Sequence, residues 1–143
     1  MKEIITMWKY RGDYILGHIF QADMKQYFKQ HYDTHNEQMI AVPIPLSNDR
    51  LYERGFNQAE MLADFLSVRI ENVLTRTMNE KQAKKTRLER IMTVNPFNLV
   101  KSLNNPVLLV DDIYTTGRTL RHAAQLLKEA GCQEVYALTL CRG

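Results

Sequence analysis

Cysteine is scarce in this chain of 143 residues. The two that are present, Cys132 and Cys141, are too few for a disulfide framework or for a structural zinc site. Both lie in segments whose patterns indicate packed structure. We therefore expect two buried, reduced thiols in a cytoplasmic protein.

Long apolar runs and a strong charge of one sign are also missing. No stretch approaches the roughly 20 residues of a membrane helix, and the N-terminus has no signal-peptide hydrophobic region or cleavage site. We expect no membrane insertion. The formal net charge is +3 and the pI is about 8.9. This balance suits a polyanionic ligand but does not diagnose nucleic-acid binding.

The composition is that of a globular protein, with 45% hydrophobic and 24% charged residues. We expect one domain over residues 1–143, with an N-terminal helical part at about 1–37 and a core at about 38–143. Helical spacing of apolar residues predicts a helix from Asp13, whose side chain suits an N-cap, to about Gln30. The loop at 31–37 holds two histidines and two acids, but their spacing favours an ordinary polar loop over a metal site.

Strands and helices alternate along the core. Buried strands are predicted at 38–43, 107–110 and 135–140, with a short strand at 73–75 and an edge strand at 97–100. Helices are predicted at 57–68, with Asn57 as the N-cap, and at 120–130, with Gly131 at the C-terminal cap. The strand–helix–strand order over 107–140 implies a parallel pair with a right-handed crossover. The pattern predicts an α/β fold with a mostly parallel sheet flanked by helices.

Chemistry concentrates in residues 106–119. The apolar run 107–110 is followed by Asp111 and Asp112, and then by a turn rich in Thr and Gly that leads into a helix. Ligands of open α/β sheets lie beyond the carboxyl ends of the strands, and backbone N–H groups at a helix start suit phosphate. We expect the two acids to bind hydroxyls or a metal, and Thr115 to Thr119 to bind phosphate. A magnesium site on the acid pair alone, as in receiver domains, would leave the threonines unexplained.

Two basic segments are further candidates. Residues 45–56 are predicted to form a strand-to-helix loop whose Arg50 and Arg54 suit an anion such as pyrophosphate, the alternative being an ordinary charged loop. Residues 79–90 are rich in cations, with Lys84, Lys85 and Arg87 among them. They are predicted to form either a solvated helix face or a mobile basic flap that closes over a bound pyrophosphate.

Residues 107–119, VLLVDDIYTTGRT, resemble the phosphoribosyl pyrophosphate (PRPP) motif of type I phosphoribosyltransferases over about 13 positions. The resemblance implies that the catalytic pair Asp111 and Asp112 binds the ribose hydroxyls. It also implies that the 5′-phosphate is wrapped by a loop of Thr115, Thr116, Gly117, Arg118 and Thr119.

Three further segments resemble the competence protein F family of that superfamily: residues 9–12 (KYRG), 54–60 (RGFNQAE) and 82–97. The resemblance implies a role in natural competence, in uptake or handling of single-stranded DNA, beside a DNA-translocating, helicase-like partner. Family members usually carry an N-terminal four-cysteine zinc motif. This sequence has none, so either it is truncated or it is a shorter member, and no zinc is expected in it.

Two functions remain open from the sequence. As a binding module, the chain would hold PRPP or a nucleotide and contact single-stranded DNA, with bases stacking on aromatic residues such as Trp8, Tyr10, Tyr52 and Phe56. Core packing is the alternative for Trp8 and Phe56. As an enzyme, it would be a Mg²⁺-dependent phosphoribosyltransferase acting on a nucleobase or other acceptor, with Mg²⁺ held mostly by PRPP oxygens and water, near Asp111 and Asp112. The sequence marks no acceptor pocket.

Overall fold

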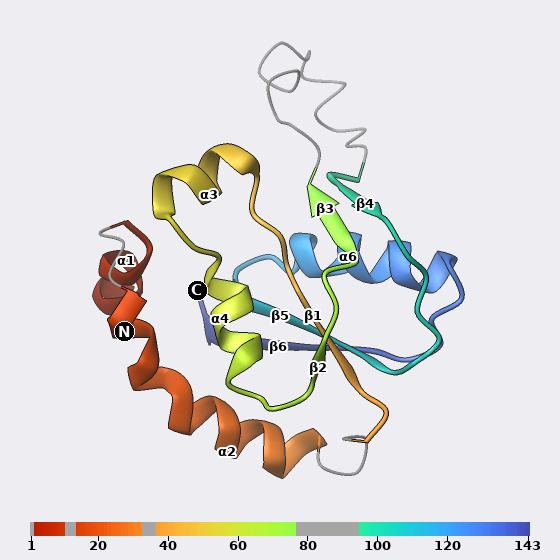
Figure 1. Cartoon of the computed structure of the whole chain (residues 1–143), viewed down its shortest axis with the longest axis horizontal. Coiled ribbons are helices and arrows are strands. Elements are labelled where there is room, and N and C mark those ends of the chain that lie inside the picture. The colour runs from red at the N-terminus through yellow and green to blue at the C-terminus, as the bar shows by residue number, and fades with distance from the viewer. Residues whose placement is uncertain (1, 11–13, 33–36, 77–94) are drawn as a thin grey trace.

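The computed structural model describes residues 2–10, 14–32, 37–76 and 95–143. Its centre is a four-stranded parallel sheet with the strand order β2–β1–β5–β6 (Figure 1). The strands are β2 (Arg69–Ile70), β1 (Ile40–Pro43), β5 (Val107–Tyr114) and β6 (Val135–Arg142). This arrangement confirms the predicted α/β class with a parallel sheet, and the predicted parallel pairing of the last two strands.

The centre of the sheet is apolar on both faces. All four residues of β1 are buried, as are the first four of β5, because each strand lies between two others and is covered from both sides. The prediction that the second of these strands ends at Val110 was wrong. β5 continues through the acid pair to Tyr114 and stays paired with β6, where Asp111 lies opposite Thr139.

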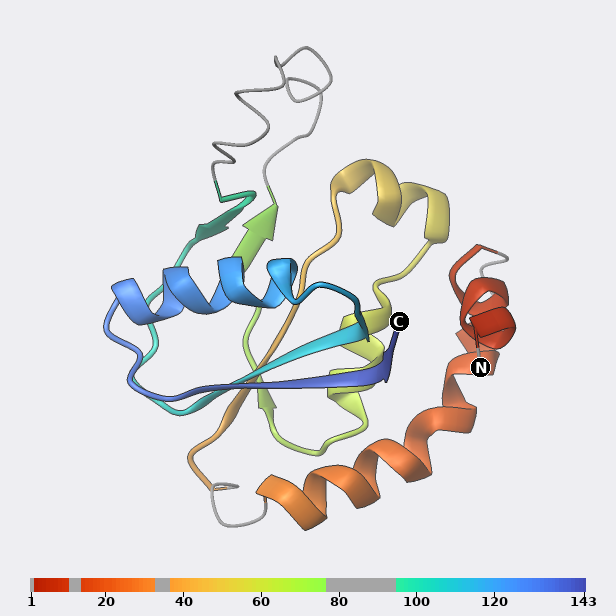
Figure 2. The same ribbon diagram turned by 180° about the vertical axis from the view of Figure 1, so that it is seen from behind.

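Two hydrophobic cores fill the two faces of the sheet, which Figures 1 and 2 show from opposite sides. One face packs against α1 (Lys2–Tyr10), the 3₁₀ helix η1 (Tyr14–Phe20), α2 (Gln21–Tyr32) and α4 (Gln58–Asp64). The other face packs against α6 (Arg118–Glu129) and against a separate antiparallel pair, β3 (Leu74–Arg76) and β4 (Phe97–Leu99).

Several predicted elements differ in detail. The strands predicted at 73–75 and 97–100 exist, but they pair with each other outside the main sheet. The helix predicted from Asp13 is instead η1 followed by α2, with Asp13 itself outside the described residues. The loop predicted at 45–56 contains α3 (Asn48–Arg54), whose N-cap is Ser47. No residue of α3 is buried, so it shows no hydrophobic period in the sequence.

Other local predictions are confirmed. Asn57 caps α4, since its side chain accepts a hydrogen bond from the backbone N–H of Ala59. Gly131 follows the C-cap residue of α6 and has a φ of 101°, in the left-handed region that glycine tolerates. Of the two thiols predicted to be buried, Cys132 is buried, whereas Cys141 is only partly buried. The basic segment with Lys84, Lys85 and Arg87 lies outside the described residues.

Trp8 belongs to the core. Its side chain is fully buried and packs against Phe20 and Phe56, so the stacking of bases on Trp8 considered from the sequence is wrong. No helix in the part of the chain that the structure describes has the length and apolar character to cross a membrane.

Gly17 of η1 leaves room for the side chains of Trp8 and Met61 to pack against it, so Gly17→Ala is expected to destabilise the fold. A Cβ atom there would lie 2.5 Å from Met61 Sδ and 2.8 Å from Trp8 Nε1. Met61 can move, but the buried indole cannot, so we expect a loss of about 1–3 kcal/mol in the free energy of unfolding. Denaturant unfolding followed by the fluorescence of Trp8, the only tryptophan, measures it. Because Met61 is itself a core residue, the pair is compared as a double-mutant cycle: Gly17→Ala should cost less in a Met61→Ala background, where one of the two clashes is gone, than in the wild-type chain. An unchanged midpoint in the single variant would contradict the packing argument.

Candidate functional site

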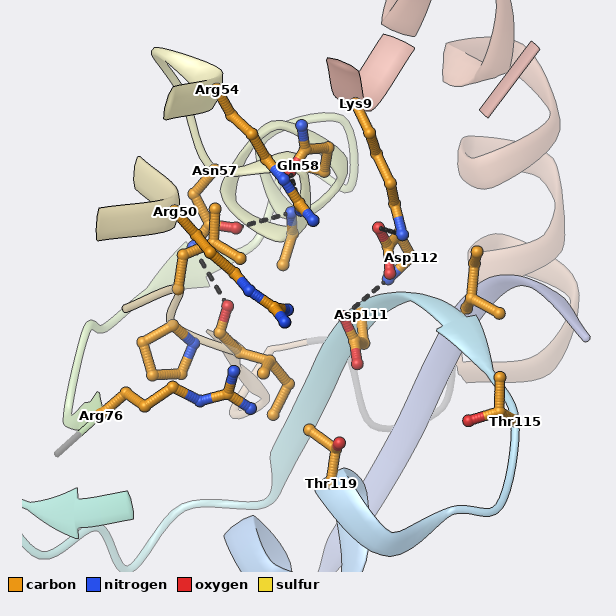
Figure 3. Close-up of a pocket in the computed structure, with 15 residues that line it drawn as sticks. Lys9, Arg50, Arg54, Asn57, Gln58, Arg76, Asp111, Asp112, Thr115 and Thr119 are labelled. Atoms are coloured by element: carbon orange, nitrogen blue, oxygen red, sulfur yellow. Dashed lines mark hydrogen bonds and ion pairs between the residues drawn. The ribbon is translucent and has the colours of Figure 1, made fainter. Parts of the chain in front are cut away.

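An open cleft of about 230 Å³ lies where the predicted site residues meet, beyond the end of β1 (Figure 3). β1 ends at Pro43, whereas β5 and β6 continue, so the sheet has a step at this edge. The segment after β1, which leads into α3, forms one wall, and β5 with the following loop forms the other. The polar residues that line the cleft are Lys9, Arg50, Arg54, Asn57, Gln58, Arg76, Asp111, Asp112, Thr115 and Thr119.

The acid pair occupies the strand wall. Asp111 is partly buried, and its Oδ1 accepts a hydrogen bond of 2.9 Å from the backbone N–H of Asp112. Burial, with the neighbouring carboxylate of Asp112 as the second cause, raises the pKa of Asp111 from 3.8 to about 7. Perturbed acids of this kind are concentrated at functional sites. The sequence predicted both residues in the site, and the structure places both in the cleft.

Lys9, which the sequence did not mark as a site residue, closes one end of the cleft. Its Nζ lies 2.5 Å from Asp112 Oδ2, and both side chains are largely buried. Lys9 comes from the last turn of α1, more than a hundred positions before its partner. The KYRG segment is part of the family resemblance, but only the fold brings its lysine to the acid pair.

The threonine loop forms the turn between β5 and α6. Gly117 has a φ of 74° and is the residue before α6. The loop is braced from within: Thr116 Oγ1 accepts from the Arg118 N–H, and Arg121 Nη2 donates to the Thr116 carbonyl at 2.9 Å. Of the five predicted phosphate residues, Thr115 and Thr119 line the cleft. The cleft is not lined by Thr116 and Gly117 of the loop or by Arg118, the first residue of α6.

The opposite wall is cationic. Figure 3 shows the guanidinium groups of Arg50, Arg54 and Arg76 turned toward the same space, across from Asp111. The structure therefore brings the two predicted arginines to the site and adds Arg76, from the end of β3. Burial, with the charge of Arg50 as a second cause, lowers the pKa of Arg76 from its ordinary value.

The RGFNQ segment has a structural role in this wall. Asn57 Nδ2 donates to the carbonyl of Ile44 at 3.0 Å, and Asn57 Oδ1 accepts from Ala59 N–H, so one side chain both caps α4 and fixes the segment after β1. Arg54 Nη1 donates to Gln58 Oε1 at 3.1 Å. Gln58 is buried, and its Nε2 is left without a hydrogen-bond partner among the residues that the structure describes.

Within the described ranges, no group of three or more histidine, cysteine or acidic residues could hold a metal ion. The cleft offers only the carboxylates of Asp111 and Asp112, and Lys9 already neutralises the second. Such a set fits Mg²⁺, which keeps several waters and takes few protein ligands, where the bound molecule supplies the remaining oxygens.

Comparison with known proteins agrees with the fold. The family model described as "Phosphoribosyl transferase domain" matches residues 51–143. Among solved structures, a hypoxanthine phosphoribosyltransferase from Staphylococcus aureus has a TM-score of 0.53 and 16% identity, covering 88% of this chain and 64% of that one. An allosteric regulatory enzyme of purine biosynthesis has a TM-score of 0.54 and 19% identity, over 84% of this chain and 25% of that one. These likenesses confirm the type I phosphoribosyltransferase fold.

Curated relatives are closer in sequence. Competence protein ComFC of Bacillus subtilis is 40% identical over 99% of this chain and 60% of its own length. ComFC of Streptococcus pneumoniae is 34% identical over 99% of this chain and 63% of its own length. DNA utilization protein YhgH of Escherichia coli O157:H7 is 33% identical over 71% of this chain and 48% of its own length. The chain thus spans about three fifths of the ComFC relatives. Family model, fold and relatives agree that the chain belongs to the competence protein F family of the type I phosphoribosyltransferase superfamily.

Proposed function

We propose that this chain binds PRPP in the cleft and acts in the cytoplasmic handling of incoming single-stranded DNA. The observation that supports PRPP best is the arrangement of three chemistries in one cleft. Carboxylates that suit ribose hydroxyls lie between a hydroxyl-bearing loop and a wall of three guanidinium groups. PRPP carries a 5′-phosphate, a ribose and a diphosphate, which are the groups that these three chemistries recognise.

Magnesium belongs to this proposal. When bound, Mg²⁺ would neutralise charge on the diphosphate, near Asp111 and Asp112. The chain itself would hold the ribose through the acid pair and would place Arg50 and Arg54 on the diphosphate. Lys84, Lys85 and Arg87 lie outside the described residues, and from the sequence they are further candidates for contacts with the diphosphate.

The DNA part of the proposal comes from the relatives, whose names refer to competence and to DNA utilization. Two exposed aromatic side chains on helices that also contribute residues to the cleft, α1 and α3, are available to stack bases: Tyr10 is 73% exposed and Tyr52 is 92% exposed. Arg54 lies over the Tyr10 ring at 5.6 Å, which places a cation beside one of these platforms. A DNA-translocating, helicase-like protein is the partner that the family resemblance suggests.

Calorimetric titration of PRPP, with and without Mg²⁺, tests the ligand. We expect saturable binding that Mg²⁺ strengthens and that is abolished by Asp111→Ala combined with Asp112→Ala. Binding retained in this double variant would show that the acid pair does not hold the ribose. Asp23→Ala combined with Asp49→Ala, on exposed turns of α2 and α3, removes the same charge and serves as the control.

Phosphoribosyl transfer to an acceptor is the second candidate. The acids that would hold the ribose lie opposite the cations that would receive the diphosphate as a leaving group. Phosphoribosyl transfer requires this arrangement, and so does the binding of PRPP. Incubation with PRPP, Mg²⁺ and each nucleobase in turn should release pyrophosphate if the chain is an enzyme. No release above the blank with any base would favour the binding role.

DNA binding through the basic residues predicts a steep dependence on salt. The affinity for a single-stranded oligonucleotide should fall as salt rises, since neutralised phosphates release counterions. Lys84→Ala combined with Lys85→Ala should reduce the slope of log affinity against log salt by about 1–2. A salt-independent affinity, or a slope unchanged in this variant, would exclude these lysines as DNA contacts.

A further inference from the structure

The two edges of the central sheet differ in how they are protected. β2 forms one edge and has only two residues, and its Arg69 pairs with Glu71. β6 forms the other edge and has eight residues, with no proline and a single charged residue, Arg142, at its end. Sheets protect their edges with short strands, charges or proline, because an open edge pairs with another strand. By this standard the β2 edge is protected and the β6 edge is open.

The backbone of β6 shows which of its groups face outward. Val107 N–H donates to the Glu134 carbonyl, and residues along a parallel strand alternate between its two sides. The N–H and C=O groups of the odd-numbered residues from 135 to 141 therefore point away from β5. The Tyr32 hydroxyl, which donates to the Ala137 carbonyl at 3.0 Å, agrees with this direction and leaves that oxygen a second lone pair. No other described strand lies beside this edge, and Figure 2 shows α6 above β6 and α2 below it.

A groove of about 360 Å³ runs along the same edge. It lies between residues 137–142 of β6 and a helical wall that includes Phe20, Met24 and Tyr27. Tyr27 is half-exposed, so apolar surface of this wall is open to solvent. A strand added to β6 would cover that surface and would also pair with the outward backbone groups. The edge therefore offers two kinds of interaction to a strand of another chain.

The sequence of this edge is complementary to itself. In an antiparallel pair of two β6 strands centred on Leu138, the outward-facing Ala137 lies opposite the outward-facing Thr139 of the second copy. The same register places Glu134, the residue before β6, opposite Arg142 of the second copy, once at each end. Opposite charges directly across a strand pair are favourable. Neither side chain forms an ion pair with another residue in the described ranges.

We propose that two copies of this chain pair through β6 and join their four-stranded sheets into one continuous sheet. The charges select a second copy, because a strand of another protein would need an acid and an arginine at these same two positions. The symmetric pair leaves only β2, the protected strand, at the two outer edges. The cleft that holds the acid pair includes no residue of β6, so this inference does not rest on the binding of PRPP.

Sedimentation velocity over a concentration series tests the pair, with a reductant present so that Cys141 cannot cross-link the copies. The mass of the wild-type chain should rise with concentration from 16.8 kDa to twice that value. Glu134→Arg and Arg142→Glu should each weaken the dimer about 5- to 30-fold, because each sets like charges opposite one another at both ends. The two substitutions together should return the affinity to within about threefold of the wild type. Thr139→Pro removes an outward N–H, which an edge strand tolerates, and should abolish pairing in a chain that circular dichroism shows to be folded.

Arg69→Glu is the matched control. It reverses one charge at the opposite edge of the sheet and should leave the dimer unchanged. A wild-type chain that remains monomeric at about 0.1 mM would overturn the proposal and would leave the edge to an extended segment of another protein. So would a dimer that both single charge reversals leave unchanged, one that the double exchange fails to restore, or an equal loss in Arg69→Glu.

Discussion

Asp111→Asn is expected to stabilise the unliganded protein while it weakens PRPP binding about 10- to 100-fold. The asparagine amide keeps an oxygen that can accept from the Asp112 N–H, so the local hydrogen bond survives. The substitution removes a carboxylate whose ionised form is disfavoured by burial and by Asp112. The variant should therefore raise the free energy of unfolding of the unliganded protein and lower its affinity for PRPP.

The direction of the stability change follows from proton binding. The pKa of Asp111 is about 7 in the folded protein against an ordinary value of 3.8. Between these values the folded state holds a proton that the unfolded state has lost, so this group makes the free energy of unfolding fall as pH rises from about 4 to 7. Above about pH 7 the full loss of stability caused by the ionised Asp111 carboxylate is present. Because Asp111 is partly exposed, we expect Asp111→Asn to gain about 1–2 kcal/mol at pH 8 and less at pH 5.

Thermal unfolding at the two pH values measures this effect, with exposed Asp23→Asn as the control. A gain of the same size at pH 5 and pH 8 would contradict the raised pKa. PRPP affinity in the wild-type chain should rise with pH through about 7, since an ionised carboxylate accepts from ribose hydroxyls more strongly. The ligand's own phosphates also titrate, so the decisive quantity is the part of the pH dependence that disappears in Asp111→Asn.

Gly117→Ala should damage the phosphate loop more than any other small change in it. Gly117 has a φ of 74°, and a Cβ there would lie 2.6 Å from the Tyr114 hydroxyl and 2.8 Å from its ring. Alanine thus adds both backbone strain and a clash with a side chain over which Arg142 lies. We expect a loss of about 1–3 kcal/mol in stability and at least about a tenfold loss in PRPP affinity, as Thr115 and Thr119 shift.

Gly131→Ala, just beyond the other end of α6, is a matched control. Its φ is 101°, but a Cβ there would meet nothing within 4 Å. It should therefore destabilise the protein through strain alone and leave PRPP affinity unchanged. Adding Tyr114→Ala to Gly117→Ala should restore part of the affinity by removing the clash. If Gly131→Ala lost as much affinity as Gly117→Ala, the effect would come from helix α6 as a whole and not from the loop.

The sequence could predict those site residues that follow one another along the chain. Asp111, Asp112 and the threonine loop follow a buried strand within a few positions, so local pattern was enough to place them. Lys9 and Arg76 are absent from that prediction because α1 and β3 reach the cleft only through packing of distant segments. The KYRG segment carries a family resemblance, but it does not assign its lysine to the acid pair, and no motif in the sequence includes Arg76.

The errors in the fold have local causes. α3 has no buried residue, so its helical period is invisible in the sequence. The carboxylates that follow Val110 indicated a strand end, yet β6 continues to pair with the chain beyond them. The polar residues there are tolerated because β1 has already ended and one side of β5 is open to the cleft.

That continuation of β5 decides which acid does what. Successive side chains of a strand point to opposite faces of the sheet, and here Val107 and Leu109 belong to the α6 core while Leu108 and Val110 belong to the α1 core. Asp111 therefore shares its face with β3 and Arg76, and Asp112 shares its face with α1 and Lys9. Inserting or deleting one residue between Val107 and Val110 would exchange the two acids, leaving the motif's composition nearly intact but each carboxylate facing the wrong cation.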